Sequence, residues 1–136
     1  MSGILVDSNV LLDLMTDDPR WAEWSQHQLE IWSVKGPLFI NTVVYAEASV
    51  GFARIEEWDA MLATMPIELV ETPRPALFLA GKVFRNYRRS GGRATGVLPD
   101  LFIGAHAAVV SLPLLTRDTR RYRTYFPSLE LVAPHR

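Results

Sequence analysis

The 136-residue sequence contains no cysteine, which excludes disulfides, thiolate metal sites and cysteine nucleophiles. It has no apolar run approaching the ~20 residues that a membrane-spanning helix needs, and its N-terminus lacks the basic segment and apolar core of a signal peptide. The glycine patterns GxxxxGK[ST] and GxGxxG are also missing, so nucleotide binding through a glycine loop is unsupported. We therefore expect a soluble, cytoplasmic protein that forms one domain over residues 1–136.

Basic residues are scarce in the first half of the chain. The formal net charge is only −1, yet residues 1–73 carry three basic and twelve acidic side chains. Residues 74–123 carry ten basic and two acidic ones, and twelve of the fourteen basic residues in the chain are arginine. Arginine suits bidentate phosphate contacts. This division indicates a polyanionic ligand or an oppositely charged partner, although solvated helix surfaces would give the same pattern.

Short apolar segments alternate with helical patterns along the chain. We expect strands at residues 4–6, 38–40, 67–70, 112–115 and 129–132. Helices are expected at residues 10–15, 19–36, 43–53 and 54–64. A long helix is expected to open at Pro73 and Pro75 and to run through Tyr87, with basic residues on its last turn and exit, and further helices begin at residues 99 and 120. This alternation, with few hairpin signals, predicts an α/β fold with a mainly parallel sheet and helices on both faces.

Two aspartates follow predicted strands. Asp7 comes directly after strand 4–6, and Asp118 follows strand 112–115 by three residues. The carboxyl ends of parallel strands are where ligands bind in open α/β sheets, so both carboxylates are candidate ligands. Capping of the following helix is the alternative role for Asp7, since Asp is a preferred N-cap residue.

Two more acids are expected to reach the same edge from neighbouring helices. Glu47 shares a helix face with Val44 and Val50, and an acid on an apolar face is costly unless it is paired or functional. Asp100 lies in the first turn of a helix with small residues such as Gly104, which would let its backbone approach the sheet. A surface position for Glu47 and a favourable helix-dipole position for Asp100 are the alternatives.

Four carboxylates in one place would repel one another strongly unless a cation neutralised them or some were protonated. Carboxylate oxygen is the donor that Mg²⁺ and Mn²⁺ prefer, and such ions can support phosphodiester hydrolysis by water. Thr116 and Asn9 are candidates to orient these acids. No catalytic role is expected for the three histidines, His27, His106 and His135.

Four segments of the sequence together resemble the motifs of a known protein family. The matching segments are LVDSNVLL at residues 5–12, Ala46-Glu47, PDLFIGAHA at residues 99–107 and LPLLTRD at residues 112–118. Their order and separations resemble the motifs of the PIN domain, specifically the VapC toxins of toxin–antitoxin pairs. The departures are modest: Ser8 stands where Thr is frequent, and Gly104 and His106 lie in a helix that is often richer in alanine.

The resemblance implies a three-layer α/β/α fold and a Mg²⁺- or Mn²⁺-dependent endoribonuclease. By position, Asp7, Glu47, Asp100 and Asp118 would form the catalytic and metal-binding cluster, with Thr116 as its polar companion. The implied partners are an RNA substrate (transfer or ribosomal RNA), a VapB-like antitoxin and a second copy of the chain in a homodimer. Operator DNA would be reached only through the antitoxin.

Four arginines of the basic part of the chain are the candidate RNA contacts. Arg89 and Arg93 lie in the basic segment at residues 82–93, and Arg117 and Arg120 follow the strand at 112–115. Two other functions remain open from the residues: a non-catalytic module that binds RNA or an acidic protein, with the carboxylates acting as caps, and a DNA-directed nuclease of related fold.

Overall fold

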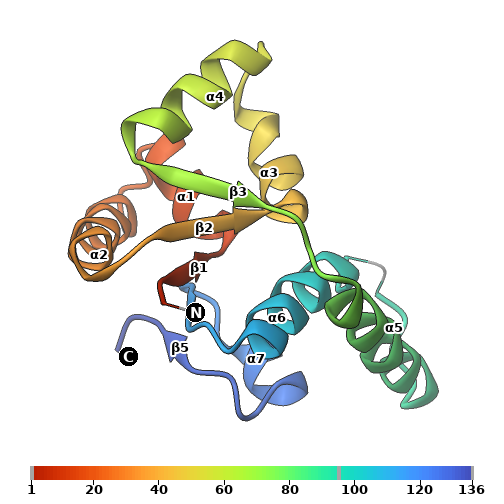
Figure 1. The fold of residues 1–136 in the computed structure, drawn as a ribbon. Helices are drawn as coiled ribbons and strands as arrows, with labels where there is room; N and C mark the ends of the chain where they lie inside the picture. The colour runs from red at the N-terminus through yellow and green to blue at the C-terminus, as the bar shows by residue number, and fades with distance from the viewer. Residues whose placement is uncertain (1, 95, 136) are drawn as a thin grey trace.

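The structure, a computed structural model, describes residues 2–94 and 96–135, and Figure 1 shows its elements. The strands are β1 (Ile4–Val6), β2 (Leu38–Asn41), β3 (Ile67–Val70), β4 (Leu114–Leu115) and β5 (Leu131–Val132). The first helices are α1 (Ser8–Met15), α2 (Ala22–Lys35), α3 (Thr42–Ala48), the 3₁₀ turn η1 (Ser49–Gly51) and α4 (Ile55–Thr64). The later helices are α5 (Arg74–Arg89), α6 (Leu98–Val110) and α7 (Arg120–Tyr125).

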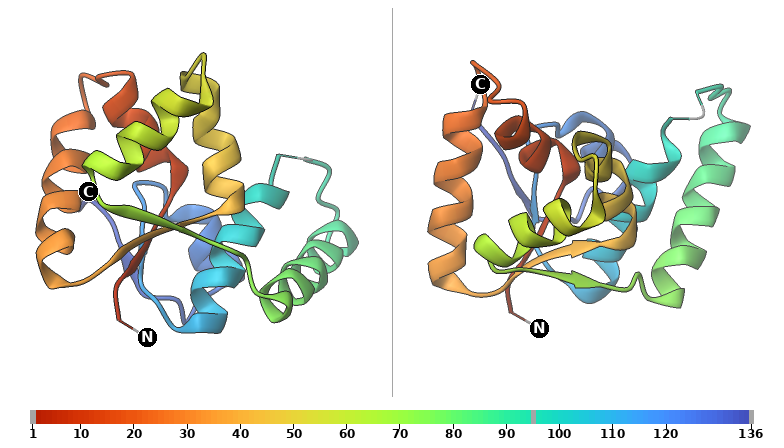
Figure 2. Two further views of the ribbon diagram at one scale, coloured as in Figure 1. Left: turned by 45° about the horizontal axis from the view of Figure 1, so that its top comes forward. Right: turned by 90° about the horizontal axis from the view of Figure 1, so that it is seen from above.

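The five strands form one parallel sheet in the order β3-β2-β1-β4-β5, which confirms the predicted α/β class. The central strand β1 pairs with β2 on one side and β4 on the other, with Leu5 opposite Phe39 and Leu114. All residues of β1, β2 and β4 are buried, as expected for parallel strands covered by helices. In Figures 1 and 2, α2 lies on one side of the sheet and α5 and α6 on the other.

The parallel arrangement brings the carboxyl ends of β1, β2 and β4 to one edge of the sheet. Asp7 follows β1, Asn41 ends β2, and Thr116 follows β4. Asp7 and Asn41 each cap the helix that starts there, since the side chain of Asp7 accepts from the Ser8 amide and that of Asn41 from the Val44 amide. The strand-to-helix turns therefore fix the polar side chains at this edge.

The long helix expected before residue 90 is confirmed as α5, which continues to Arg89, so that of the cations in the basic segment 82–93 only Arg93 lies beyond it. Two other local expectations were wrong. The helix expected over 43–53 ends at Ala48, and Val50 in the following turn is 81% exposed, so it does not extend the apolar face of Glu47. Gly104 does not bring α6 close to the sheet; it faces the aromatic rings of Phe126 and Tyr122.

Within residues 2–94 and 96–135, no helix combines the length and apolar character that crossing a membrane requires.

Candidate functional site

Asp7 is almost completely buried, and every oxygen of its carboxylate accepts a hydrogen bond. Oδ1 accepts from the Ser8 amide at 2.7 Å, and Oδ2 accepts from the Thr116 hydroxyl at 2.9 Å and the Tyr122 hydroxyl at 2.8 Å. Burial raises the pKa of Asp7 to about 6, while the hydrogen bond from Tyr122 opposes this shift. Asp7 is therefore the N-cap of α1, the alternative role considered from the sequence, and it is also a poorly solvated acid.

Thr116 and Asn9 tie Asp7 to the turn after β4. The Asn9 amide donates to the Thr116 hydroxyl at 3.1 Å, and the Thr116 hydroxyl lies 3.1 Å from both the carbonyl oxygen and the amide nitrogen of Asp118. Asp118 itself is exposed, and its Oδ1 accepts from the amide of Arg120. The two residues expected to orient the acids thus occupy the space between Asp7 and Asp118.

Glu47 reaches the same region from α3. The Ser8 hydroxyl donates to Glu47 Oε1 at 2.9 Å and lies 3.4 Å from Asp7 Oδ1. Partial burial raises the pKa of Glu47, and this hydrogen bond from Ser8 counteracts it. Ser8 is therefore the bridge between the first two acids, a role that the sequence analysis did not assign.

Asp100, in the first turn of α6, is held by a cation. Arg121 Nη1 lies 2.6 Å from Asp100 Oδ2, and the two side chains are 38% and 27% exposed. Burial raises the pKa of Asp100, the Arg121 guanidinium lowers it, and the charge of Asp118 raises it further. The charge of Asp100 in turn raises the pKa of both Asp7 and Glu47. The four sequence-predicted acids are therefore coupled electrostatically through Asp100.

Within the described part of the chain, no three His, Asp or Glu side chains stand as a ready-made metal-ligand set. All four acids instead accept hydrogen bonds from donors of the protein: Asp7 from Tyr122 and Thr116, Glu47 from Ser8, Asp100 from Arg121, and Asp118 from the Arg120 amide. The donor chemistry nevertheless fits a hard divalent cation, since the cluster offers only carboxylate and hydroxyl oxygens and its members raise one another's pKa. These carboxylates could hold Mg²⁺ or Mn²⁺ once the ion displaces the protein groups that now donate hydrogen bonds to them.

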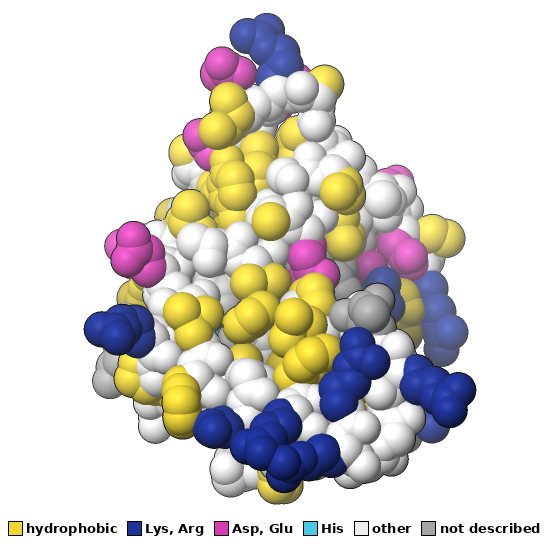
Figure 3. Space-filling view, turned by 90° about the vertical axis from the view of Figure 1, so that its right-hand side faces the viewer, with side chains coloured by type: hydrophobic (Ala, Val, Ile, Leu, Met, Phe, Trp, Pro, Cys, Tyr) yellow, Lys and Arg dark blue, Asp and Glu magenta, His cyan; other side chains and the backbone are white. Residues whose placement is uncertain are grey.

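Two hollows flank the acid cluster. An apolar one of about 430 Å³ is lined by Thr42, Val43, Ala46, Glu47, Leu98, Pro99 and Phe102. A polar one of about 410 Å³ is lined by Asp118, Arg120, Arg121, Thr124 and Tyr125. Figure 3 shows apolar side chains gathered on the face beside α5 and α6, with acidic side chains next to them and Lys and Arg side chains along the border. An acidic site lying between an apolar and an arginine-lined hollow can accept a ligand that has both apolar and anionic parts.

The four proposed RNA-contacting arginines differ in their surroundings. Arg89, Arg93 and Arg120 are exposed. Arg117 Nε instead donates to both carboxylate oxygens of buried Asp13, at 3.0 and 2.8 Å, and its guanidinium lies over the Trp21 ring. Arg117 therefore anchors the turn after β4 to α1, which leaves less of its side chain available to a ligand.

Sequence reasoning missed two contributors on α7, Arg121 and Tyr122. Tyr122 is 115 positions from Asp7, so nothing local in the sequence indicates their hydrogen bond. Burial, followed by the nearby Asp7 charge, raises the pKa of Tyr122 well above its ordinary value, which keeps its hydroxyl protonated as a donor. The apolar spacing of Tyr122 and Phe126 within a basic segment is the one signal that could have marked this helix as packed rather than solvated. Of the histidines, His106 is buried with its ring 3.2 Å from the Asn41 amide nitrogen.

Comparison with known proteins agrees with this architecture. A family model described as the PIN domain matches residues 4–127. VapBC2 from Rickettsia felis, solved bound to a DNA fragment from its promoter, superposes with a TM-score of 0.73 at 17% identity, covering 98% of this chain and 100% of that one. A toxin–antitoxin complex from Klebsiella pneumoniae gives 0.69 at 22% identity, and DNA-bound VapBC from Salmonella typhimurium gives 0.72 at 17%, each covering 98% of both chains. No curated protein matches the sequence.

Proposed function

Because the chain belongs to the PIN-domain family, we propose that it is a metal-dependent endoribonuclease, the toxin of a VapBC-type pair. The observation that carries this proposal is the buried Asp7, coupled to Asp100 at the carboxyl edge of the parallel sheet and accompanied there by Glu47 and Asp118. A helix cap alone would not require three other acids around it. This concentration of carboxylate has a chemical use if it binds Mg²⁺ or Mn²⁺.

The proposed ligands of the cation are Asp7, Glu47, Asp100 and Asp118. A divalent cation held there would supply a Lewis acid for a phosphodiester and would lower the pKa of water. The chain itself contributes orientation, since Tyr122 and Thr116 fix Asp7 and Ser8 fixes one oxygen of Glu47. Two donors on one oxygen also help Asp7 to stay ionised near neutral pH despite its burial. In the net reaction water attacks phosphorus, one ester P–O bond breaks, and the leaving oxygen takes up a proton.

RNA is the proposed substrate because the exposed cations lie beside the acids. Lys82, Arg85, Arg88 and Arg89 are exposed on α5, which packs against the helix that carries Asp100. These side chains can hold phosphates on either side of the bond to be cleaved. Transfer or ribosomal RNA, the substrates that the family resemblance implies, are the first to test.

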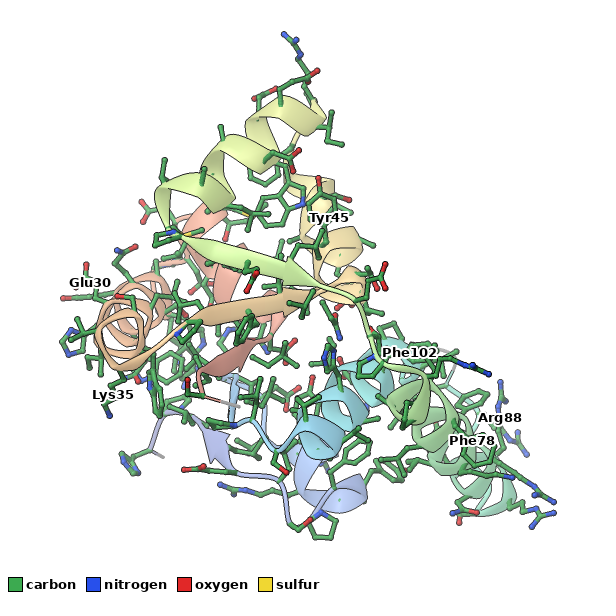
Figure 4. All side chains as sticks on the ribbon, in the orientation of Figure 1. Glu30, Lys35, Tyr45, Phe78, Arg88 and Phe102 are labelled. Atoms are coloured by element: carbon green, nitrogen blue, oxygen red, sulfur yellow. The ribbon has the colours of Figure 1, made fainter. Side chains whose placement is uncertain are left out.

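A VapB-like antitoxin and a second copy of the chain are the proposed protein partners, with operator DNA bound only through the antitoxin. The support is an apolar surface beside the site: Phe78 on α5 is 69% exposed and Leu77 is 43% exposed, near the hollow that Phe102 lines. Figure 4 places Phe78, Phe102 and Arg88 on the same side of the molecule. Large exposed apolar residues next to one another are typical of protein-binding surfaces.

The test is cleavage of purified transfer and ribosomal RNA by the wild-type protein and by Asp100→Asn, in Mn²⁺, Mg²⁺ or EDTA. Wild type should cleave only with a divalent cation, and Asp100→Asn should lose about 100-fold or more of the rate, since one ligand to the catalytic cation is lost. Asp17→Asn, which removes the same charge from an exposed turn, is the matched control and should cleave normally.

Two outcomes would contradict the proposal. RNA binding that is indifferent to EDTA, without cleavage, would identify a non-catalytic module. Preferential cleavage of DNA in the same assay would identify a DNA-directed nuclease.

A further inference from the structure

One arginine, Arg121, contacts the acid cluster directly. Arg121 and Tyr122 are consecutive residues of α7, and each holds one acid: Arg121 contacts Asp100 and Tyr122 contacts Asp7. The Arg121–Asp100 contact is an ion pair of 2.6 Å, close enough for a charge-assisted hydrogen bond. One of the two carboxylate oxygens of Asp100, Oδ2, is thus already occupied by a guanidinium.

We propose that Arg121 is a resident counter-cation of the acid cluster, which a divalent cation must displace from Asp100 in order to bind. The inference rests on the proposed function, because it concerns the same acids. It assigns Arg121 a positioning role that sets the metal concentration at which the site fills. The four acids were identified from the sequence, but nothing there marked Arg121 as different from its basic neighbours.

Asp100 is the acid at which a single positive charge has the greatest effect. It interacts with the charges of Asp7, Glu47 and Asp118, whereas the other three acids are linked mainly through it. A guanidinium at Asp100 therefore relieves repulsion across the whole cluster. If Arg121 stayed in place when a divalent cation arrived, two cations would share the single negative charge of Asp100 and would repel each other. The guanidinium and the divalent cation therefore compete for Asp100.

The surroundings of Arg121 allow it to leave. Its side chain is 38% exposed, so the pair is partly hydrated and can separate without leaving a buried charge alone. The polar hollow of about 410 Å³ that Arg121 lines, together with Arg120 and Thr124, gives the guanidinium space beside the cluster. Once released, Arg121 would still lie next to Asp118, within the arginine-lined hollow.

The test measures Mn²⁺ affinity by titration calorimetry at pH 7.5 for wild type, Arg121→Gln, Arg121→Lys and Arg123→Gln. Arg123 is exposed on the same helix, so its variant removes the same charge without touching Asp100. Arg121→Gln should bind Mn²⁺ about fivefold more tightly, the effect of removing one competing, partly exposed ion pair. Arg121→Lys should stay near wild type because the charge is kept, and Arg123→Gln should change affinity by less than about twofold.

Thermal unfolding supplies a second readout that does not depend on activity. In EDTA, Arg121→Gln should unfold at a lower temperature than Arg123→Gln, because its acid cluster has lost its counter-cation. Saturating Mn²⁺ should then stabilise Arg121→Gln more than it stabilises Arg123→Gln. At equal Mn²⁺ concentration, the protein that binds the ion more tightly gains more stability.

The outcomes separate this inference from the function beneath it. Equal Mn²⁺ affinities for Arg121→Gln and Arg123→Gln, or weaker binding by Arg121→Gln, would overturn the counter-cation role and leave the nuclease proposal standing. Absence of Mn²⁺ binding by every protein, with RNA cleavage unchanged in Asp100→Asn, would overturn both.

Discussion

Asp7 shows what a single residue contributes when burial and hydrogen bonding oppose each other. Its pKa of about 6 in the folded protein lies above its ordinary value of 3.8, so the folded state takes up a proton more readily than the unfolded state. The stabilisation that follows is complete below pH 3.8 and is lost as the pH rises through about 6. The metal-free protein should therefore become more stable on mild acidification.

We predict that wild type in EDTA gains about 1.4 kcal/mol in free energy of unfolding between pH 7.5 and pH 5.0, relative to Asp7→Asn. The comparison isolates Asp7, because Glu47 and Asp100, whose pKa values are also raised, titrate in both proteins. Urea unfolding at the two pH values measures it. Parallel changes in the two proteins would show that Asp7 titrates normally.

Tyr122 is the second residue whose contribution can be isolated. Tyr122→Phe removes the hydroxyl that donates to Asp7 at 2.8 Å and leaves the buried ring in place. Loss of a hydrogen bond to a charged acceptor should cost about 1.5–3 kcal/mol of stability at pH 7.5. The cost should shrink at pH 5.0, where Asp7 carries a proton.

The matched control is Tyr125→Phe, on the same helix, where a cost of about 0.5 kcal/mol or less is expected. Urea unfolding at both pH values distinguishes the two variants. A Tyr122→Phe cost that does not vary with pH would mean that the hydroxyl supports packing rather than the charge of Asp7.

At the scale of elements, the contact between α6 and α7 decides whether the acids meet. An ideal Cβ on Gly104 would lie 2.5 Å from the Phe126 ring and 3.1 Å from the Tyr122 ring, so only glycine lets α7 lie this close to α6. Gly104→Ala should therefore lower stability by about 1–3 kcal/mol through overpacking. It should also tighten Mn²⁺ binding, since moving α7 draws Arg121 away from Asp100, as the Arg121→Gln substitution does.

Gly81→Ala on α5 is the control for helix propensity. A Cβ there meets nothing within 4 Å, and the substitution should raise stability by about 0.5–1 kcal/mol. Urea unfolding and calorimetric Mn²⁺ titration of both variants provide the comparison. Equal stability changes in the two variants would show that α7 can move away from α6 without cost.

The same elements show how far sequence reasoning reaches. Asp7 could be placed because a buried apolar strand ends at it, and the parallel sheet then fixes the position of Asp118 near it. Arg121 and Tyr122 could not, because their partners depend on how α7 packs against α6, which no local pattern encodes. Gly104 was singled out as a site of close approach, but which element approached it depended on that same tertiary packing.

At the scale of the whole molecule, the chain separates its charges. Residues 1–73, which are mainly acidic, supply Asp7 and Glu47. Residues 74–123, which are mainly basic, supply Asp100 and Asp118 together with the arginines of α5 and α7. Figure 3 shows acidic, basic and apolar side chains on one face, with most Lys and Arg side chains along its lower edge. A polyanion approaching this face would be drawn to the exposed cations of α5, while the remaining negative charge of the acids would repel its phosphates. Cation binding at the acids would remove that repulsion, so metal and RNA binding should be mutually favourable.

Whether Arg89 and Arg93 contact RNA can be tested by the salt dependence of RNA binding. Ca²⁺ replaces Mn²⁺ in these measurements, so that cleavage is slowed while binding is followed. The double variant Arg89→Gln with Arg93→Gln removes two exposed cations near the end of α5. If both contact phosphates, the slope of log affinity against log salt concentration should become shallower by about 1.4 for single-stranded RNA. Lys35→Gln with Arg54→Gln removes the same charge from exposed positions in the acidic half and should leave the slope unchanged. Equal flattening in both double variants would mean that net charge, rather than contact at Arg89 and Arg93, governs binding, whereas no change in either would assign these two arginines to a surface that RNA does not touch.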